Sequence, residues 1–227
     1  MIKNYRDLAS EYASSVNTKS YNAYYERPIM LDLVGDVKDK EILELGCSTG
    51  FYTNELTKMG ANVLGVDGSK EMLAYAKEIN PTLNFKCFDL NDTLDYPKRF
   101  DIVFASLVVH YIKDLRKLYS ELYSLIKPGG KIIISTHNPV NEYLRLSDDY
   151  LKIEYVEDTW KFGEKLYTMN YYTRSIQETL MPLIESGFEL NKVLEPKPKD
   201  ILKEKDLKTY QKLTKKAGFL FIEGIRK

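Results

Sequence analysis

Three short segments carry residues whose types and spacing suit the binding of a nucleoside-type cofactor. The run ILELGCSTGFY at 42–52 is an apolar stretch that breaks into a loop with Gly46 and Gly50. Asp67 follows Gly46 by 21 residues, and a carboxylate at that distance can accept hydrogen bonds from both ribose hydroxyls. Asp89 ends a third apolar run, where it could accept from an exocyclic amine. The structural alternatives are a tight turn for Gly46 and Gly50, a helix cap for Asp67 and an exposed turn for Asp89. The joint occurrence of these residues after consecutive strands favours a cofactor site.

The glycine loop also distinguishes between cofactors. A dinucleotide-binding loop has the pattern G-x-G-x-x-G, whose glycines let the backbone approach a pyrophosphate. Here Ser48 stands at the second glycine position, and nothing supplies the third glycine. Glu44 lies just before the loop, where its negative charge opposes a pyrophosphate and suits a cationic amino or sulfonium group. The loop therefore predicts a cationic cofactor.

The chain has two histidines, and each follows a predicted strand directly. The carboxyl ends of parallel strands meet at one edge of a sheet, so we expect His110 and His137 to overlook the cofactor crevice. A histidine there can act as a general base toward an oxygen or nitrogen nucleophile, which makes both candidate catalytic residues. A hydrogen-bonded structural role is the alternative. Ser106 is expected beside the cofactor, and Tyr111 and Asn138 are expected to line the acceptor site.

The elements that must position these residues alternate between short apolar runs and helical patterns. Runs rich in Ile, Val and Phe predict strands at 41–45, 62–66, 83–88, 100–106 and 131–135. Helices are predicted between them at 51–60, 69–80 and 114–130, each ended by glycine or proline. Two final strands at 188–196 and 219–227 are expected to form an antiparallel pair that completes the sheet. The fold class is therefore α/β, with a doubly wound, mostly parallel, Rossmann-like sheet of seven strands and helices on both faces.

The whole chain, 1–227, is expected to be a single domain with four parts. These are an N-terminal helical lid at 1–35, a cofactor-binding core at 36–135, a substrate cap inserted at 138–172 after the fifth strand, and a C-terminal helix with the strand pair at 173–227. The lid is predicted from amphipathic patterns at 2–16 and 21–35. The insert is polar and aromatic, with possible short strands at 151–156 and 165–170. Aromatic walls would suit a flat, apolar or cationic acceptor, although ordinary packing is the alternative.

Composition narrows the possible partners. Lys and Arg total 33 and Asp and Glu total 33, a balance that argues against a protein that coats nucleic acid. Residues 192–227 are an exception, with eleven basic against five acidic residues, and we interpret them as a solvated helix face, with an anionic partner as the alternative. Two cysteines fit a reducing compartment, and no apolar run reaches 18 residues. We therefore expect a cytoplasmic protein without membrane insertion or a metal site, as a monomer or homodimer.

Five motifs in order resemble those of class I S-adenosylmethionine-dependent methyltransferases. Glu44–Gly50 is similar to their E/D-x-G-x-G-x-G motif, Val66–Ser69 with Met72 resembles the second motif, and Phe88–Leu90 the third. The fourth and fifth are FDIVFASLVVHYIKD at 100–114 and LIKPGGKIIIS at 125–135. The resemblance covers residues 5–135 and is strongest to the small-molecule branch typified by quinone-biosynthesis methyltransferases (type 11). Ser48 departs from the pattern, in which glycine is usual.

The resemblance implies S-adenosylmethionine as cofactor and S-adenosylhomocysteine as product. It implies that Asp67 binds the ribose, that Asp89 meets the adenine amine, and that Met72 packs on the adenine ring, with a plain core role as the alternative for Met72. The predicted cofactor contacts are Tyr21, Glu44, Leu45, Gly46, Cys47, Ser48, Gly50, Asp67, Gly68, Met72, Phe88, Asp89, Leu90 and Ser106. The predicted acceptor contacts are Tyr111, Asn138 and Tyr172.

The predicted function is methyl transfer, by in-line displacement, to an oxygen or nitrogen of a small molecule. Nucleic acid is disfavoured as the acceptor, because residues 106–109 are SLVV rather than the N/D-P-P-Y run common in enzymes that methylate base amines. Two alternatives remain open: a regulatory module that binds the cofactor without turnover, and a nicotinamide-dependent oxidoreductase. The sequence does not identify the acceptor.

Overall fold

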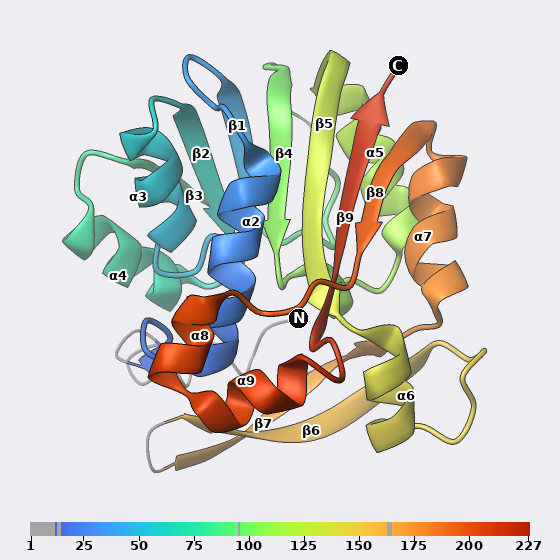
Figure 1. Cartoon of the computed structure of the whole chain (residues 1–227). Coiled ribbons are helices and arrows are strands. Elements are labelled where there is room, and N and C mark those ends of the chain that lie inside the picture. Colours follow the sequence, from blue (N-terminus) through green and yellow to red (C-terminus); the bar gives the residue numbers. More distant parts are fainter. Residues whose placement is uncertain (1–11, 13–14, 95, 163–164) are drawn as a thin grey trace.

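A seven-stranded sheet forms the centre of the computed structural model, which describes residues 12, 15–94, 96–162 and 165–227 (Figure 1). The strand order is β3-β2-β1-β4-β5-β9-β8. The strands are β1 (Glu41–Leu45), β2 (Asn62–Asp67), β3 (Asn84–Cys87), β4 (Phe100–Ser106), β5 (Ile126–His137), β8 (Phe188–Leu194) and β9 (Phe219–Arg226). All neighbours pair in parallel except β9, which is antiparallel to both β5 and β8. The predicted doubly wound sheet with its antiparallel final pair is confirmed.

Helices cover both faces of this sheet because its central strands are apolar on both faces. Alternate side chains of a strand point to opposite faces. Ile42 therefore packs with α2 (Arg27–Val34) and α3 (Phe51–Lys58), whereas Leu43 packs with α5 (Leu115–Leu125) and α7 (Ile176–Glu185). The helix α4 (Lys70–Ile79) packs against β2 and β3. This arrangement places the strand-end loops at one edge of the sheet.

Side chains cap the starts of two helices that pack on the sheet. Ser69 accepts a hydrogen bond from Met72 N at the start of α4, and Asp114 accepts one from Lys117 N at the start of α5. The predicted end of α5 at residues 128–130 was wrong. The helix ends at Leu125, because Ile126 takes an extended conformation and pairs with Phe100 of β4. Strand pairing thus outweighs the local helical pattern in the last turn.

The N-terminal part is only partly described. The predicted helix at 2–16 lies largely outside the described residues. The predicted helix at 21–35 exists, but it begins as the π-helical turn η1 (Asn22–Glu26) and continues as α2. Gly35, at φ 67°, ends it. π-Helical turns occur frequently at functional sites, and this one ends at Glu26, which lies beside the strand ends.

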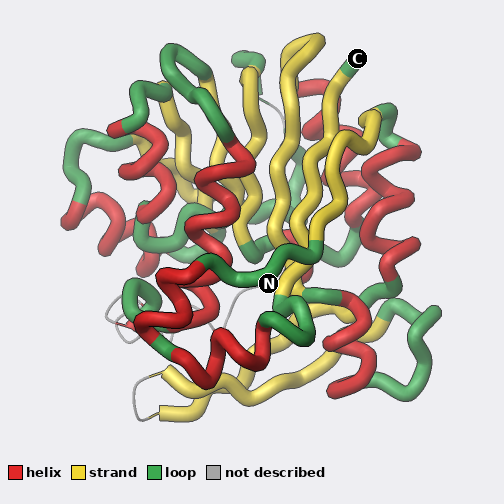
Figure 2. The backbone as a smooth tube through the Cα atoms, viewed as in Figure 1, coloured by secondary structure: helices red, strands yellow, loops and turns green. Residues whose placement is uncertain are grey.

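Two regions of the chain form a layer across the carboxyl ends of the strands (Figures 1 and 2). The first is the insert, with α6 (Pro139–Leu146) and a hairpin of β6 (Glu154–Phe162) and β7 (Lys165–Thr173), whose strands are longer than predicted. The second is α8 (Asp200–Lys205) and α9 (Leu207–Leu213), in the segment predicted to be a single lysine-rich helix. The C-terminal region therefore contributes to the cap. No described helix is long and apolar enough to cross a bilayer.

Candidate functional site

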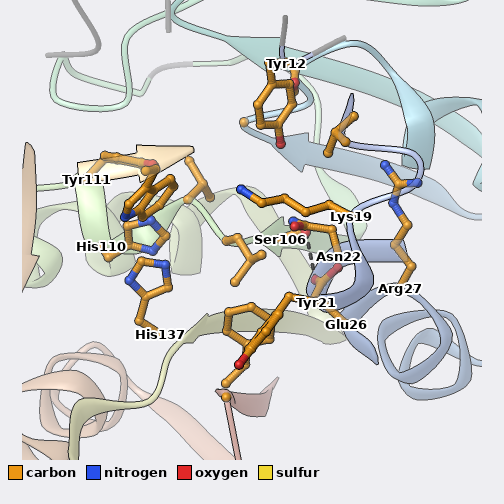
Figure 3. Close-up of a pocket in the computed structure, with 18 of the residues that line it drawn as sticks. Tyr12, Lys19, Tyr21, Asn22, Glu26, Arg27, Ser106, His110, Tyr111 and His137 are labelled. Carbon is orange, nitrogen blue, oxygen red and sulfur yellow. Dashed lines mark hydrogen bonds between the residues drawn. The ribbon is translucent and has the colours of Figure 1, made fainter. Parts of the chain in front are cut away.

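A cavity of about 910 Å³ lies between the carboxyl ends of the strands and the cap (Figure 3). Its walls come from the loops after β1, β2 and β4, the N-terminal segment with η1, the β6–β7 hairpin, and the end of α9. Thirteen predicted site residues line it: Tyr21, Glu44, Gly46, Cys47, Ser48, Asp67, Gly68, Met72, Leu90, Ser106, His110, Tyr111 and His137. The cavity thus brings the predicted cofactor and acceptor residues to one place.

The loop after β1 has an unusual backbone. Gly46, Ser48 and Gly50 all have left-handed conformations, with φ of 66°, 51° and 81°. A Cβ at Gly46 would lie 2.6 Å from Cγ2 of Val108, so glycine is required there. Ser48 keeps the conformation that glycine adopts readily, and its amide donates to Oδ2 of Asp67 at 2.8 Å. The serine therefore leaves the glycine-type loop intact.

Asp67 connects the first two strand-end loops. Its Oδ2 accepts from Ser48 N, its Oδ1 accepts from Ser69 N at 2.8 Å, and each oxygen retains a lone pair. The carboxyl group is buried yet lies on the cavity wall. Burial raises its pKa, and the two backbone donors act in the opposite direction. These remaining lone pairs fit a pair of hydroxyl donors such as those of a ribose.

Glu44 is a second buried carboxyl group on the cavity wall. It is 2 % exposed and accepts a hydrogen bond from Thr53 Oγ1. Burial raises its pKa to about 8, Asp67 adds to the rise, and the bonds from Thr53 oppose it. None of the described lysines or arginines forms an ion pair with it. A cationic ligand group would supply the missing countercharge, as the amino group of S-adenosylmethionine can.

Six predicted site residues do not line this cavity. Leu45 is fully buried in the core, and Gly50 precedes α3 at a position where a Cβ would collide with the Phe85 ring. The Asp89 carboxylate accepts from both the backbone and side-chain nitrogens of Asn91 at 3.0 Å, which is the exposed-turn alternative. Phe88 packs on the edge of the core. The remaining two, Asn138 and Tyr172, belong to the cap.

Asn138 and Tyr172 have structural contacts instead. Asn138 caps α6 by accepting from the amides of Val140 and Asn141, and it donates to Glu195. Tyr172 packs on Tyr155 and Arg174. Because successive strand residues point to opposite faces, its neighbour Tyr171 faces the two histidines. Period-two alternation along β7 was the signal that could have identified Tyr171.

The two histidines form a stacked pair on the cavity wall. Their ring centroids are 4.0 Å apart, and the planes differ by 16°. His110 belongs to the short helix η2 (Val109–Tyr111) after β4, and His137 is the last residue of β5. His110 is 4 % exposed, and neither ring nitrogen has a hydrogen-bond partner among the described residues. Burial lowers the pKa of His110 well below its usual value, and His137 acts in the same direction. His110 is therefore neutral at pH 7.

Glu142, which sequence reasoning missed, lies behind His137. Its Oε2 is 3.6 Å from Nδ1 of His137 and accepts from Tyr171 OH at 2.6 Å and from Arg145 Nη2 at 3.0 Å. Burial alone would raise its pKa, but His137, Tyr171 and Arg145 together lower it to about 2. Glu142 is thus ionised at neutral pH, and its carboxylate lies against the imidazole of His137. No local pattern in the sequence marks this residue.

Glu26 is a further missed residue of the cavity wall. It is 1 % exposed and accepts from Ser106 Oγ at 2.8 Å, Ser135 Oγ at 2.6 Å and Tyr52 OH at 2.7 Å. The bond from Ser106 joins η1 to the end of β4 (Figure 3), and the bonds from Ser135 and Tyr52 join it to β5 and α3. The adjacent Arg27 also lines the cavity, with its guanidinium 3.5 Å from the ring centroid of Phe51. Glu26 therefore anchors the N-terminal segment to the site.

Comparisons with known proteins agree with this geometry. The model of a methyltransferase domain matches residues 43–134. A ubiquinone biosynthesis O-methyltransferase of Coxiella burnetii is 28% identical over 144 residues, which are 60% of this chain and 61% of that protein. This chain thus spans less than two thirds of the length of that curated relative.

Solved structures extend the similarity to the fold of the whole chain. A putative S-adenosylmethionine-dependent methyltransferase from Listeria monocytogenes has a TM-score of 0.76 and 25% identity, covering 89% of this chain and 96% of that one. The DhpI-SAM-HEP complex has a TM-score of 0.70 and 24% identity, covering 98% and 94%. The fold and the cavity define a cofactor-binding α/β protein of the class I type. These similarities support a methyltransferase of the class I type, and the proteins that this chain resembles include enzymes that depend on S-adenosylmethionine.

Proposed function

We propose that this protein transfers a methyl group from S-adenosylmethionine to an oxygen or nitrogen of a small molecule held against His110 and His137. The observation that carries the proposal is the stacked histidine pair on the wall of the same cavity as Glu44 and Asp67. A buried imidazole with both nitrogens unpartnered among the described residues is costly unless a ligand supplies the hydrogen bond. A polar acceptor would supply it.

The residues of the cavity fit the cofactor at several points. Asp67 would bind the ribose hydroxyls, and Glu44 would bind the amino group, since both are buried carboxyl groups with free lone pairs. Met72 and Leu90 would flank the adenine ring. Arg27 would pair with the carboxylate. When bound, S-adenosylmethionine supplies a methyl carbon that its sulfonium activates for in-line displacement.

The protein's own contribution is alignment, exclusion of water and proton transfer. Neutral His110 accepts a hydrogen bond from the acceptor hydroxyl or amine and so directs a lone pair of the nucleophile. His137 accepts the proton that the nucleophile loses on methylation, because ionised Glu142 stabilises the resulting imidazolium. Burial lowers the pKa of His110, which suits it to orienting the acceptor in its neutral form. The pair thus divides orientation and proton transfer between its members.

The name of the Coxiella burnetii relative, a ubiquinone biosynthesis O-methyltransferase, favours oxygen over nitrogen as the accepting atom. Similarity to S-adenosylmethionine-dependent enzymes and the buried Glu44 both disfavour the nicotinamide-dependent alternative.

The test is a screen for S-adenosylhomocysteine release over phenols, quinols, amines and carboxylates. We expect turnover with at least one class of oxygen or nitrogen acceptor. Tight binding of S-adenosylhomocysteine without turnover of any acceptor would instead support a regulatory module. If calorimetry shows tighter binding of NADH than of S-adenosylhomocysteine, the proposal is wrong.

A further inference from the structure

Three lysines line the acceptor side of the cavity, and we name them the lysine trio: Lys19, Lys212 and Lys216. Lys19 comes from the N-terminal segment, Lys212 from α9, and Lys216 from the turn that follows α9. No ammonium group of the trio forms a hydrogen bond or an ion pair with any described residue. Three positive charges therefore reach one cavity from distant parts of the chain.

Lys19 is the most constrained member of the trio. Its side chain extends across the cavity toward His110 and Tyr111 (Figure 3). Its Nζ lies 3.8 Å from the ring centroid of Phe162 and 5.9 Å from that of Trp160, on the β6–β7 hairpin. Burial lowers its pKa. Aromatic faces compensate part of the lost hydration of an ammonium ion but provide no countercharge.

Lys212 and Lys216 extend the positive region along the C-terminal part of the cap. They are four residues apart, so in a helical turn they project to the same side. Lys212 Nζ lies 5.7 Å from the ring centroid of Tyr21, itself a residue of the cavity wall. The intervening Lys215 does not line the cavity. The lysine-rich segment therefore turns one face to the cavity rather than only to solvent.

The acids on this side of the cavity are already paired. Arg145 binds Glu142 at 3.0 Å and Asp158 at 2.8 Å. Glu26 accepts three hydroxyl hydrogen bonds. Glu44, by contrast, lies at the loop after β1, on the cofactor side. The trio thus has no countercharge among the described acids near the histidine pair.

We propose that the acceptor carries a compact oxyanion, a carboxylate or a phosphate, that binds to the lysine trio while its methylated atom lies at the histidine pair. The inference rests on the proposed function and specifies its substrate class. Charge-assisted hydrogen bonds from ammonium to oxyanion are stronger than neutral ones. Lys19 is half-buried, so solvent screens its charge less than the charges of the exposed Lys212 and Lys216. This replaces the interpretation of the lysine-rich segment as a purely solvated face.

The experiment uses the full chain saturated with S-adenosylhomocysteine and pairs of molecules that differ only in charge. Calorimetry compares 3,4-dihydroxybenzoate with 3,4-dihydroxybenzamide, and phenyl phosphate with phenol, at constant ionic strength. In the third arm, the Tm of the protein is measured in inorganic phosphate and in sodium chloride at equal ionic strength. We expect each anion to bind at least tenfold more tightly than its neutral partner and phosphate to raise Tm. The benzoate and phenyl phosphate arms distinguish carboxylate from phosphate.

Variants assign the effect to the trio. Lys19→Met keeps the alkyl chain over Phe162 and should reduce the preference for the anion at least fivefold, as should Lys212→Gln combined with Lys216→Gln. Lys215→Gln, an exposed neighbour outside the cavity, should change nothing. S-adenosylhomocysteine affinity, measured for every variant, reports whether the cofactor site is intact.

Three results would overturn the inference. The first is the absence of any preference for the anions together with no phosphate-dependent rise in Tm. The second is a preference that survives in the lysine variants. The third is a loss of S-adenosylhomocysteine affinity in Lys19→Met as large as the loss for the anions, since Lys19 would then bind the cofactor's carboxylate. Failure of the wild type to bind S-adenosylhomocysteine at all would instead contradict the proposed function itself.

Discussion

Ser48 has a left-handed backbone conformation although it is not glycine. The hydrogen bond from its backbone amide to the Asp67 carboxylate stabilises that conformation. For a residue with a small side chain, the left-handed conformation lowers the stability of the folded state by on the order of 1 kcal/mol, and for a β-branched residue it lowers it more. We expect Ser48→Gly to change the free energy of unfolding by less than about 1 kcal/mol, and Ser48→Val to lower it by about 1–3 kcal/mol. Urea denaturation measures both. Equal stability of the two variants would mean that residue 48 is not left-handed in solution.

From the raised pKa of Glu44 we predict that protein stability and cofactor affinity depend on pH. Its pKa of about 8 exceeds the ordinary 4.5, so its contribution to the stability of the unliganded protein is fully present below pH 4.5 and is lost as the pH rises through 8. A bound cation lowers this pKa again. Between pH 6 and pH 8, binding of S-adenosylmethionine should therefore release a proton, and its affinity should rise by up to about tenfold per pH unit.

Calorimetry in two buffers of different ionisation enthalpy measures that proton release. Glu44→Gln is the control, because it keeps the shape of the side chain and removes the ionisation. The variant should bind the cofactor weakly, without proton release, and its unliganded form should have a higher Tm than the wild type at pH 9 but not at pH 5. Equal proton release in both proteins would assign the ionisation to another group.

A substitution of His110 tests whether the two histidines have the separate roles proposed for them. We expect His110→Ala to lower kcat at least tenfold while it changes the Kd for S-adenosylhomocysteine less than threefold, because the proposed role of the residue is to contact the acceptor and not the cofactor. Calorimetry and initial rates measure the two quantities. A normal rate across the pH range would show that His110 neither orients nor deprotonates the acceptor.

At the scale of elements, one ionic network joins α6 to the β6–β7 hairpin. Arg145 of α6 contacts Glu142, Asp158 and Tyr171, and Asp158 also accepts from Trp160 Nε1. This network holds the hairpin beside the histidine pair. The insert therefore acts as a structured wall of the site, and its aromatic residues are ordered by buried acids as well as by packing.

Arg145→Met should loosen that wall. We expect KM for the acceptor found by the screen to rise about tenfold and the free energy of unfolding to fall by about 1–2 kcal/mol, since Glu142 loses its cation. Arg116→Met is the matched control, because Arg116 forms an exposed pair with Glu178 and Glu185, remote from the cap. We expect Arg116→Met to lower the free energy of unfolding by less than about 1 kcal/mol and to leave KM unchanged. Similar kinetics for both variants would contradict the role of the network.

At the scale of the whole molecule, the cofactor site is built from segments of the lid, the core and the cap. Ligand binding should therefore stabilise all of them together. We propose that the chain unfolds as one cooperative unit, and that S-adenosylhomocysteine at 100 times its Kd adds about 2.7 kcal/mol to the free energy of unfolding. For a chain of this size, that corresponds to a rise in Tm of roughly 5–10 °C. Calorimetric scans that resolve a separate, ligand-insensitive transition would contradict a single domain.

Local patterns in the sequence were sufficient to predict the sheet, its parallel core and the glycine loop. Apolar runs rich in Ile, Val and Phe, helix-ending residues such as Gly60, and loop glycines such as Gly46 act over a few neighbouring residues, so they can be recognised without the fold. The end of α5 was placed wrongly because the pairing of Ile126 with Phe100 depends on a strand some 26 residues away. For Asp89, the sequence left an adenine contact and an exposed turn as alternatives, and in the structure its carboxylate accepts from Asn91 in such a turn.

The acceptor side of the cavity depends on the tertiary structure. Glu26, Glu142 and the lysine trio come from segments up to about 200 residues apart, and each is unremarkable in its own stretch of sequence. Only the packing of the lid, the insert and α9 over the strand ends brings these charges to one cavity, buries Glu26 and leaves Lys212 and Lys216 exposed at the cavity wall. The predicted cofactor residues therefore lie in short motifs that the sequence reveals, whereas the residues of the proposed acceptor site come together only through contacts between distant segments.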